Sequence, residues 1–217
     1  MILKLVKQIV RAIKEGAPEK KVQANIAALG NELLINAVRT NDTDAVNALL
    51  KQGADPNALG TLGGTALTRA ASDNNTKMIG LLLRNGANVN GVEHSYLCTR
   101  PLSEAASANA VEAAQTLIDN GADINCLDSA VQTPLMIAAE KNALEVAGLL
   151  IQSGANLEAK GGFSYSSTTL CFAVLAGHEE MTELLIKHNA KIKALNRMKS
   201  QIPPKMKRWL KEKGIFK

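Results

Sequence analysis

The feature that most constrains the fold is a five-residue segment that returns along the whole chain. It reads GADPN at 53–57, GANVN at 86–90, GADIN at 121–125, GANLE at 154–158 and NAKIK at 189–193. Each copy begins 21 residues after the start of a helix-opening tripeptide, at 32–34, 65–67, 100–102, 133–135 and 168–170. The interval to the next tripeptide alternates between 12 and 14 residues. Constant blocks with variable connectors predict a stacked array, because surface loops tolerate insertions and packed parts do not.

Each 21-residue block predicts two short antiparallel helices. In the fourth block, Thr133 is expected to cap the first helix, and Pro134 suits the first helical position. Gly154 is expected to end the second helix in the left-handed conformation. The apolar stripes of the two helices are Leu135, Ala138 and Ala139, then Val146, Leu149, Leu150 and Ile151. Helices this short are not stable alone in water, so each pair must bury its face on its neighbours.

The run TPLMIAAEKNALEVAGLLIQSGANLEA at 133–159 resembles the ankyrin repeat, whose period is about 33 residues and whose opener is T-P-L-H-x-A. The resemblance covers roughly residues 31 to 195. It implies an all-α fold, an ankyrin-type α-solenoid of stacked helix pairs with short β-hairpin-like fingers. The His of the family opener is absent from every copy, which puts its usual hydrogen bonds in question. Its position holds Ile35, Thr68, Ser103, Met136 and Cys171.

We expect N-terminal capping helices over 1–30, a repeat array over 31–200 and a basic C-terminal capping helix over 201–217. The repeats fall approximately at 31–61, 62–96, 97–129, 130–164 and 165–197. The first capping helix spans 2–14, with Ile2, Val6, Ile9 and Ile13 on its apolar face, widened by Leu3, Leu5 and Val10. A second helix is expected from Pro18 to Leu29. The alternative to a cap is a basic amphipathic helix that lies on a membrane surface.

Charge is distributed unevenly along the chain. Residues 1–30 carry a net charge of +4, residues 31–186 carry −9, and residues 187–217 carry +10. In the C-terminal helix, Met206, Trp209 and Leu210 are expected to face inward. Its basic patch is Lys205, Lys207, Arg208, Lys211 and Lys213. This patch is either the solvated face of a cap or a binding site for acidic protein, lipid headgroups or nucleic acid.

The motifs of catalysis and cofactor binding are missing from the sequence. Cys171 and His178 lie seven residues apart, too far to touch on one helix, and no H-E-x-x-H or Walker motif occurs. The glycine-rich loop at 58–65 has no lysine nearby to complete a phosphate site, so it predicts a turn with Thr65 as a helix cap. The three cysteines form no C-x-x-C pair, although Cys98 is expected to be accessible. We therefore predict no catalysis, no cofactor and no metal.

The resemblance implies a protein-binding surface made by the fingers and the exposed side of the first helices. On the first helices, the candidate residues are Arg69, Ser72, Asp73, Ser107, Glu140 and Lys141. The two longer fingers, at 91–100 and 159–168, contribute His94, Tyr96, Phe163 and Tyr165. Aromatic anchors are favoured at interfaces, and the alternative is that these rings pack locally on the helices.

Two functions follow as hypotheses. The first is a non-catalytic protein-interaction module, an adaptor, scaffold or bacterial effector-like protein, that acts as a monomer in its own or a host cytoplasm. The second is a peripheral module tethered to an anionic membrane or polyanion by its basic ends. Binding through the basic ends should weaken steeply with ionic strength, whereas binding through aromatic fingers should not.

Overall fold

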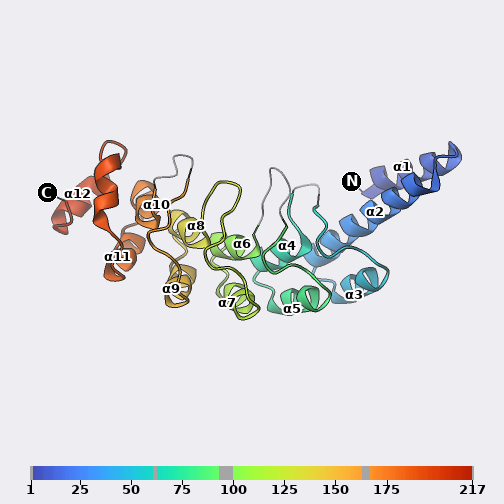
Figure 1. Cartoon of the computed structure of the whole chain (residues 1–217), viewed down its shortest axis with the longest axis horizontal. Helices are drawn as coiled ribbons and strands as arrows, with labels where there is room; N and C mark the ends of the chain where they lie inside the picture. Colours follow the sequence, from blue (N-terminus) through green and yellow to red (C-terminus); the bar gives the residue numbers. More distant parts are fainter. Residues whose placement is uncertain (1, 61–62, 93–99, 163–166, 217) are drawn as a thin grey trace.

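The computed structural model describes residues 2–60, 63–92, 100–162 and 167–216, with the side chains of Ile2, Leu3 and Leu5 left out. Its helices form an elongated array of two rows (Figure 1). The second helices of the pairs form one row: α3 (Thr43–Lys51), α5 (Thr76–Arg84), α7 (Val111–Asp119), α9 (Leu144–Gln152) and α11 (Glu179–Lys187). The first helices form the other, which begins in the C-terminal half of α2 (Glu19–Arg39) and continues with α4 (Ala66–Ser72), α6 (Pro101–Ser107), α8 (Pro134–Lys141) and α10 (Thr169–Ala176). The finger loop that joins α7 to α8 rises from the row of first helices (Figure 1).

The ends add three further elements. Helix α1 (Ile2–Lys14) packs against α2 as an antiparallel hairpin that extends beyond the first repeat (Figure 1). At the other end, a 3₁₀ helix η1 (Ile192–Met198) leads to α12 (Pro204–Glu212). The all-α solenoid predicted from the repeat is confirmed.

A single apolar core runs through the array from Leu34 of α2 to Leu210 of α12. Each first helix places a buried leucine between its neighbours, followed by two alanines in α4, α6 and α8 and by an alanine and a valine in α2 and α10, as Leu135, Ala138 and Ala139 show in α8. Small side chains let these helices approach closely. In α9, Val146 and Leu150 are fully buried, whereas the predicted stripe members Leu149 and Ile151 are only half-buried.

The predicted caps are present at two first helices. The hydroxyl of Thr65 accepts a hydrogen bond from the Thr68 N–H at 3.2 Å, and Thr133 accepts from the Met136 N–H at 3.3 Å. Pro134 occupies the first turn of α8, as predicted. The loop before Thr65 is closed by a hydrogen bond from the Gly60 N–H to the Gly64 carbonyl at 2.8 Å. The glycine-rich loop is therefore a turn.

The residues that replace the family's opener His are satisfied in different ways. The Thr68 hydroxyl donates back to the Thr65 carbonyl at 2.8 Å, and the Cys171 sulfur lies 3.5 Å from the Thr168 hydroxyl. The Ser103 hydroxyl is buried and has no hydrogen-bond partner in the part of the chain that the structure describes. Repeat 3 alone among these three leaves a polar group unpaired at this position.

The repeated GAxxN segments form a ladder of hydrogen bonds between neighbouring repeats. The last residue of one segment accepts a hydrogen bond from the backbone N–H of the third residue of the next. The pairs are Asn57 with Asn88 (2.7 Å), Asn90 with Asp123 (2.8 Å), Asn125 with Asn156 (2.8 Å) and Glu158 with Lys191 (2.8 Å). The opening glycine has positive φ, as predicted at Gly154, where φ is +90°. The repeat thus encodes contacts between units.

A second set of links comes from asparagines in the turns between the two helices of a pair. Asn41, Asn74, Asn109 and Asn142 have φ between 53° and 58°, a left-handed conformation that asparagine tolerates better than most residues. The Asn109 side chain accepts from the Val146 N–H at 3.2 Å and donates to the Glu145 carboxylate, in the next repeat. This amide lowers the pKa of Glu145.

The N-terminal segment differs from the prediction. The second helix does not stop at Leu29 but continues to Arg39, through the expected opener at 32–34. Gly30 lies within the helix and no proline occurs at 30–34 to break it, so the capping helix and the first helix of repeat 1 are one.

The prediction that Ile2, Val6, Ile9 and Ile13, widened by Val10, form the buried face of the first cap is wrong for Val6, Val10 and Ile13, which are 38%, 44% and 59% exposed. Helix α1 turns its Ala12 side toward α2, because α2 already covers the flank of repeat 1 through its contacts with α3 and α4. Ile9 is half-buried, and the side chain of Ile2 lies outside the description.

We predict that Asn109→Gly lowers the free energy of unfolding by about 1–2 kcal/mol, because the two side-chain hydrogen bonds to repeat 4 are lost. Asn109→Ala should cost about 1–2 kcal/mol more, since alanine resists the left-handed conformation. Urea unfolding of the full chain measures both.

Asn142→Gly is the matched control. Asn142 has the same backbone conformation, yet its side chain makes no hydrogen bond within the described residues. This variant should unfold close to the wild type. Equal losses in Asn109→Gly and Asn142→Gly would show that the side-chain links between repeats contribute nothing.

Candidate partner-binding surface

The predicted first-helix residues lie along the exposed side of the row of first helices. Arg69 and Asp73 of repeat 2 form an ion pair at 2.7 Å, with their side chains 47% and 34% exposed, and Ser72 beside them is half-buried. Ser107 is exposed at the end of α6, and Lys141 is exposed at the end of α8. The candidate residues on these three helices are therefore exposed or half-buried, as a binding surface requires.

The finger residues His94, Tyr96, Phe163 and Tyr165 lie outside the described residues, as does Cys98. Their contact with a partner stays a prediction. The base of the fourth finger is described. The Gly161 N–H donates to the Ser167 carbonyl, and the Gly162 N–H donates to the Val131 carbonyl of the preceding finger, both at 2.9 Å. Neighbouring fingers 3 and 4 are thus joined at their bases.

A pocket of about 210 Å³ opens between α6, α8 and the finger that joins α7 to α8. It brings together three of the predicted residues, Ser107, Glu140 and Lys141. The remaining lining residues are Arg100, Ser103, Glu104, Asp128, Ser129, Gln132 and Ile137. The pocket is therefore a junction between repeats 3 and 4, built from two first helices and one finger.

Asp128 organises the finger side of the pocket. One of its carboxylate oxygens accepts hydrogen bonds from the backbone N–H groups of Ala130 at 2.9 Å and Gln132 at 2.8 Å. The Gln132 side chain then donates to the Glu140 carboxylate at 2.9 Å, which ties the finger to α8. Lys141 lies 3.4 Å from the other Glu140 oxygen. The geometry of the pocket depends on these contacts.

The surroundings of Glu104 disfavour the ionised form of its carboxyl group. Burial raises its pKa, and the nearby charge of Asp128 raises it further. Neither Glu104 nor Asp128 forms an ion pair among the described residues. Two carboxyl groups close enough for one to raise the pKa of the other therefore line the same pocket.

Sequence reasoning missed Glu104, although a signal was present. Glu104 occupies in repeat 3 the register position that Arg69 occupies in repeat 2, five residues into the opener. The role of Asp128 had no such signal, because it depends on how the finger folds back over α8.

His178 has a structural role, as its Gly-His context predicted. Its Nε2 donates to the Glu140 carbonyl at 2.9 Å, which joins repeat 5 to repeat 4. Cys171 is fully buried in the core. The His178 and Cys171 side chains therefore contact different residues and do not form a pair.

The C-terminal basic patch divides into two groups. Lys205 and Lys213 form ion pairs with Glu179 and Glu183 of α11, at 3.2 and 2.5 Å. These two residues fasten α12 to the array. The burial of Met206 and Leu210 is as predicted, and Trp209 is half-buried.

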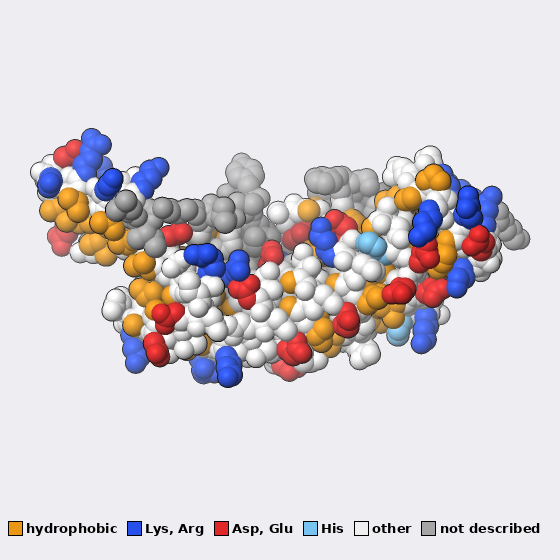
Figure 2. Space-filling model, turned by 180° about the vertical axis from the view of Figure 1, so that it is seen from behind, with side chains coloured by type: hydrophobic (Ala, Val, Ile, Leu, Met, Phe, Trp, Pro, Cys, Tyr) orange, Lys and Arg blue, Asp and Glu red, His pale blue; other side chains and the backbone are white. Residues whose placement is uncertain are grey.

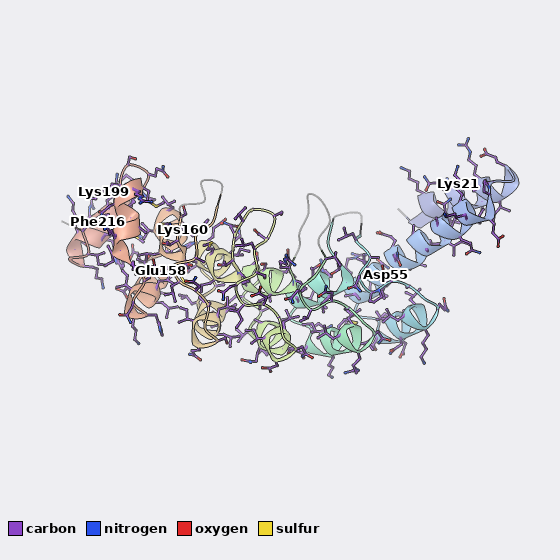
Figure 3. All side chains as sticks on the ribbon, viewed as in Figure 1. Lys21, Asp55, Glu158, Lys160, Lys199 and Phe216 are labelled. Atoms are coloured by element: carbon purple, nitrogen blue, oxygen red, sulfur yellow. The ribbon has the colours of Figure 1, made fainter. Side chains whose placement is uncertain are left out.

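The other three residues of the patch line a groove. Lys207, Arg208 and Lys211 lie around a space of about 370 Å³ together with Lys199 and Phe216. The Lys199 ammonium lies 5.0 Å from the centre of the Phe216 ring (Figure 3). No ion pair neutralises these cations within the described residues.

The N-terminal hairpin carries an exposed apolar stripe beside a row of cations. Val6, Val10 and Ile13 are 38%, 44% and 59% exposed and follow one another on one side of α1. Lys7 and Lys14 line the same surface. Figure 2 shows Lys and Arg side chains gathered over both ends of the array, with hydrophobic side chains exposed on the hairpin.

None of the helices in the described ranges is both long and apolar enough to cross a membrane. No group of three or more His, Cys, Asp or Glu residues in those ranges is placed to hold a metal ion.

We predict that Glu104→Gln stabilises the protein at neutral pH. A carboxyl group whose pKa is raised by folding stabilises the fold below its unfolded pKa and loses that contribution as pH rises through the folded pKa. The variant's advantage in melting temperature should therefore be largest near neutral pH and should disappear as pH falls below the usual glutamate range. Glu180→Gln, at the exposed start of α11, should give no such advantage. A wild type as stable as Glu104→Gln at pH 7 would contradict the assignment.

The comparisons with known proteins agree with the architecture. A family model described as ankyrin repeats, in three copies, matches residues 3–93, 34–128 and 102–196. The first match includes the N-terminal hairpin. A search of curated proteins found no match. Ankyrin repeats are generally protein–protein interaction modules, and the family is typically non-catalytic. Because the matches together cover most of the sequence, the chain belongs to the ankyrin repeat family.

Proposed function

We propose that this protein is a non-catalytic adaptor or scaffold that binds a protein partner on the face formed by its first helices and fingers. The observation that carries the proposal is the pocket between repeats 3 and 4, where Ser107, Glu140 and Lys141 meet groups from the adjoining finger. Almost all of the residues that line this concavity are polar or charged, which suits recognition of a polar or charged group of a partner. We expect Tyr96, Phe163 and Tyr165 to extend the contact from the fingers.

The rest of the surface supports the same face. On the second helices, the exposed acidic residues Glu112 and Glu145 accept hydrogen bonds from Asn74 and Asn109 of the preceding repeat, so they serve the array itself. Exposed groups on the first helices, such as Ser107, have no such role. The compartment we propose is a cytoplasm, either that of the producing cell or, for a bacterial effector, that of a host.

We predict that Ser107→Trp weakens binding of a captured partner at least about tenfold, because the indole fills the entrance of the pocket. Gln115→Trp places the same bulk on α7, in the other row of the same repeat, and should leave affinity unchanged. Calorimetry with the full chain measures affinity, and thermal unfolding checks that both variants stay folded. Loss of binding only in Gln115→Trp would place the partner on the opposite face.

A separate variant tests the fingers. Changing Tyr96, Phe163 and Tyr165 to alanine should weaken partner binding while the thermal midpoint stays close to that of the wild type. A large loss of stability with unchanged affinity would show that the rings pack locally.

A second candidate function is contact with an anionic membrane through the N-terminal hairpin. The exposed stripe of Val6, Val10 and Ile13 beside Lys7 and Lys14 has the form of an interfacial helix, apolar toward the acyl boundary and basic toward the headgroups. The unpaired cations around Phe216 at the other end would add electrostatic attraction.

We predict that Val10→Glu abolishes binding of the full chain to phosphatidylserine-containing vesicles, because it places a charge in the apolar stripe. Lys7→Glu should weaken binding in a salt-dependent way. Lys51→Glu, on exposed α3, is the control for net charge. Sedimentation with vesicles that contain or lack phosphatidylserine measures the binding. Equal losses of vesicle binding in all three variants would show that only the net charge of the protein matters.

A further inference from the structure

The pocket between repeats 3 and 4 contains two carboxyl groups, those of Glu104 and Asp128, that could bind a positively charged group. Of its two cations, Lys141 lies beside Glu140 at 3.4 Å, and Arg100 donates to the backbone carbonyls of Asn90 and Leu127 at 2.8 and 3.2 Å. Glu104 and Asp128 form no ion pair within the residues described. The contacts described for these two cations are therefore with Glu140 and with backbone carbonyls, not with Glu104 or Asp128.

A second observation points independently to a hydrogen-bonding ligand. Ser103 lines the same pocket, is only 4% exposed, and its hydroxyl lacks a hydrogen-bond partner in the described ranges. Buried hydroxyl groups are nearly always paired, and a serine oxygen can accept from an N–H donor. A donor that enters the pocket would satisfy this group.

The size of the pocket limits what can enter. Drug-sized ligands occupy roughly 300–1,000 Å³, and this pocket has about 210 Å³. A single long side chain fits that scale better than a cofactor. Among cationic side chains, arginine offers five N–H donors in a planar fork that matches carboxylate oxygens, whereas lysine offers a compact, strongly hydrated charge.

We propose that this pocket receives an arginine side chain of the protein partner, held by the carboxylates of Glu104 and Asp128 and by the Ser103 hydroxyl. This assignment rests on the proposed function and names the chemistry of the partner. The raised pKa of Glu104, caused first by burial and then by the charge of Asp128, agrees with it, because an incoming guanidinium would stabilise the ionised form of this carboxyl group.

Charge complementarity of this kind gives the site its selectivity. A neutral or acidic partner residue would leave Glu104 and Asp128 unpaired and desolvated, which costs binding energy. Lysine should bind in the same place but more weakly, because it cannot donate to two carboxylates and a hydroxyl in one plane. The order of preference expected is arginine, then lysine, then neutral residues.

The test uses the full chain and four peptide pools that differ only in their central residue. That residue is arginine, lysine, citrulline or glutamate, with randomised flanks. Citrulline keeps the shape of arginine without its charge. We expect the arginine pool to bind at least about tenfold more tightly than the citrulline pool, measured by fluorescence anisotropy. Equal binding of these two pools, or binding of neither, overturns the proposal.

Variants of the pocket complete a double-mutant cycle. Glu104→Gln combined with Asp128→Asn keeps an acceptor oxygen for the finger and should remove the preference for arginine over citrulline. Asp44→Asn combined with Glu180→Gln changes net charge equally on exposed helix starts and should retain the preference. A preference that survives the pocket variant would also overturn the proposal.

Ser107→Trp separates this inference from the proposed function. If a pool without a basic residue binds best and Ser107→Trp weakens it, the face is correct and the arginine assignment is wrong. If the arginine pool binds equally to Ser107→Trp and to the wild type, the binding face itself is wrong.

Discussion

The structure depends on apolar contact between successive first helices. No helix pair could bury its own leucines and alanines, and the core that runs from Leu34 to Leu210 exists only because each pair covers the next. Alanine at positions such as Ala105 and Ala138 lets the helices approach closely enough to leave little room for larger residues. Stability is therefore a property of neighbours, and it propagates along the array.

Directional links then set the register of the array. The GAxxN ladder and the Asn109 turn both connect a side chain in one repeat to a backbone N–H in the next. Such bonds require one relative position of the repeats, whereas apolar contact alone tolerates small slips. With the register set, the eighth and ninth residues counted from the start of each opener are exposed or half-buried in every repeat, so they line one side of the row of first helices. Ser107 and Glu140 meet in one pocket for this reason.

The two ends use their charge differently. At the C-terminus, Lys205 and Lys213 pair with α11, so part of the basic patch serves the fold and the remainder stays available around Phe216. At the N-terminus, α2 closes the array, and α1 is left with an exposed aliphatic stripe. The apolar surface that α1 leaves exposed is the physical reason for the membrane alternative.

The sequence by itself determined the repeat, the helix pairs, the caps at Thr65 and Thr133 and the turn at Gly154, because these depend on local periodicity and backbone preference. It also predicted that Ser107, Glu140 and Lys141 share one face, since register places them there, and the three residues line one pocket. It did not determine the continuous α2, the exposed face of α1 or the division of the basic patch. Nor did it determine that Glu104 and Asp128 lie near each other in one pocket. Those features arise when residues far apart in the chain compete for the same neighbours, and only the tertiary structure decides which contact is made.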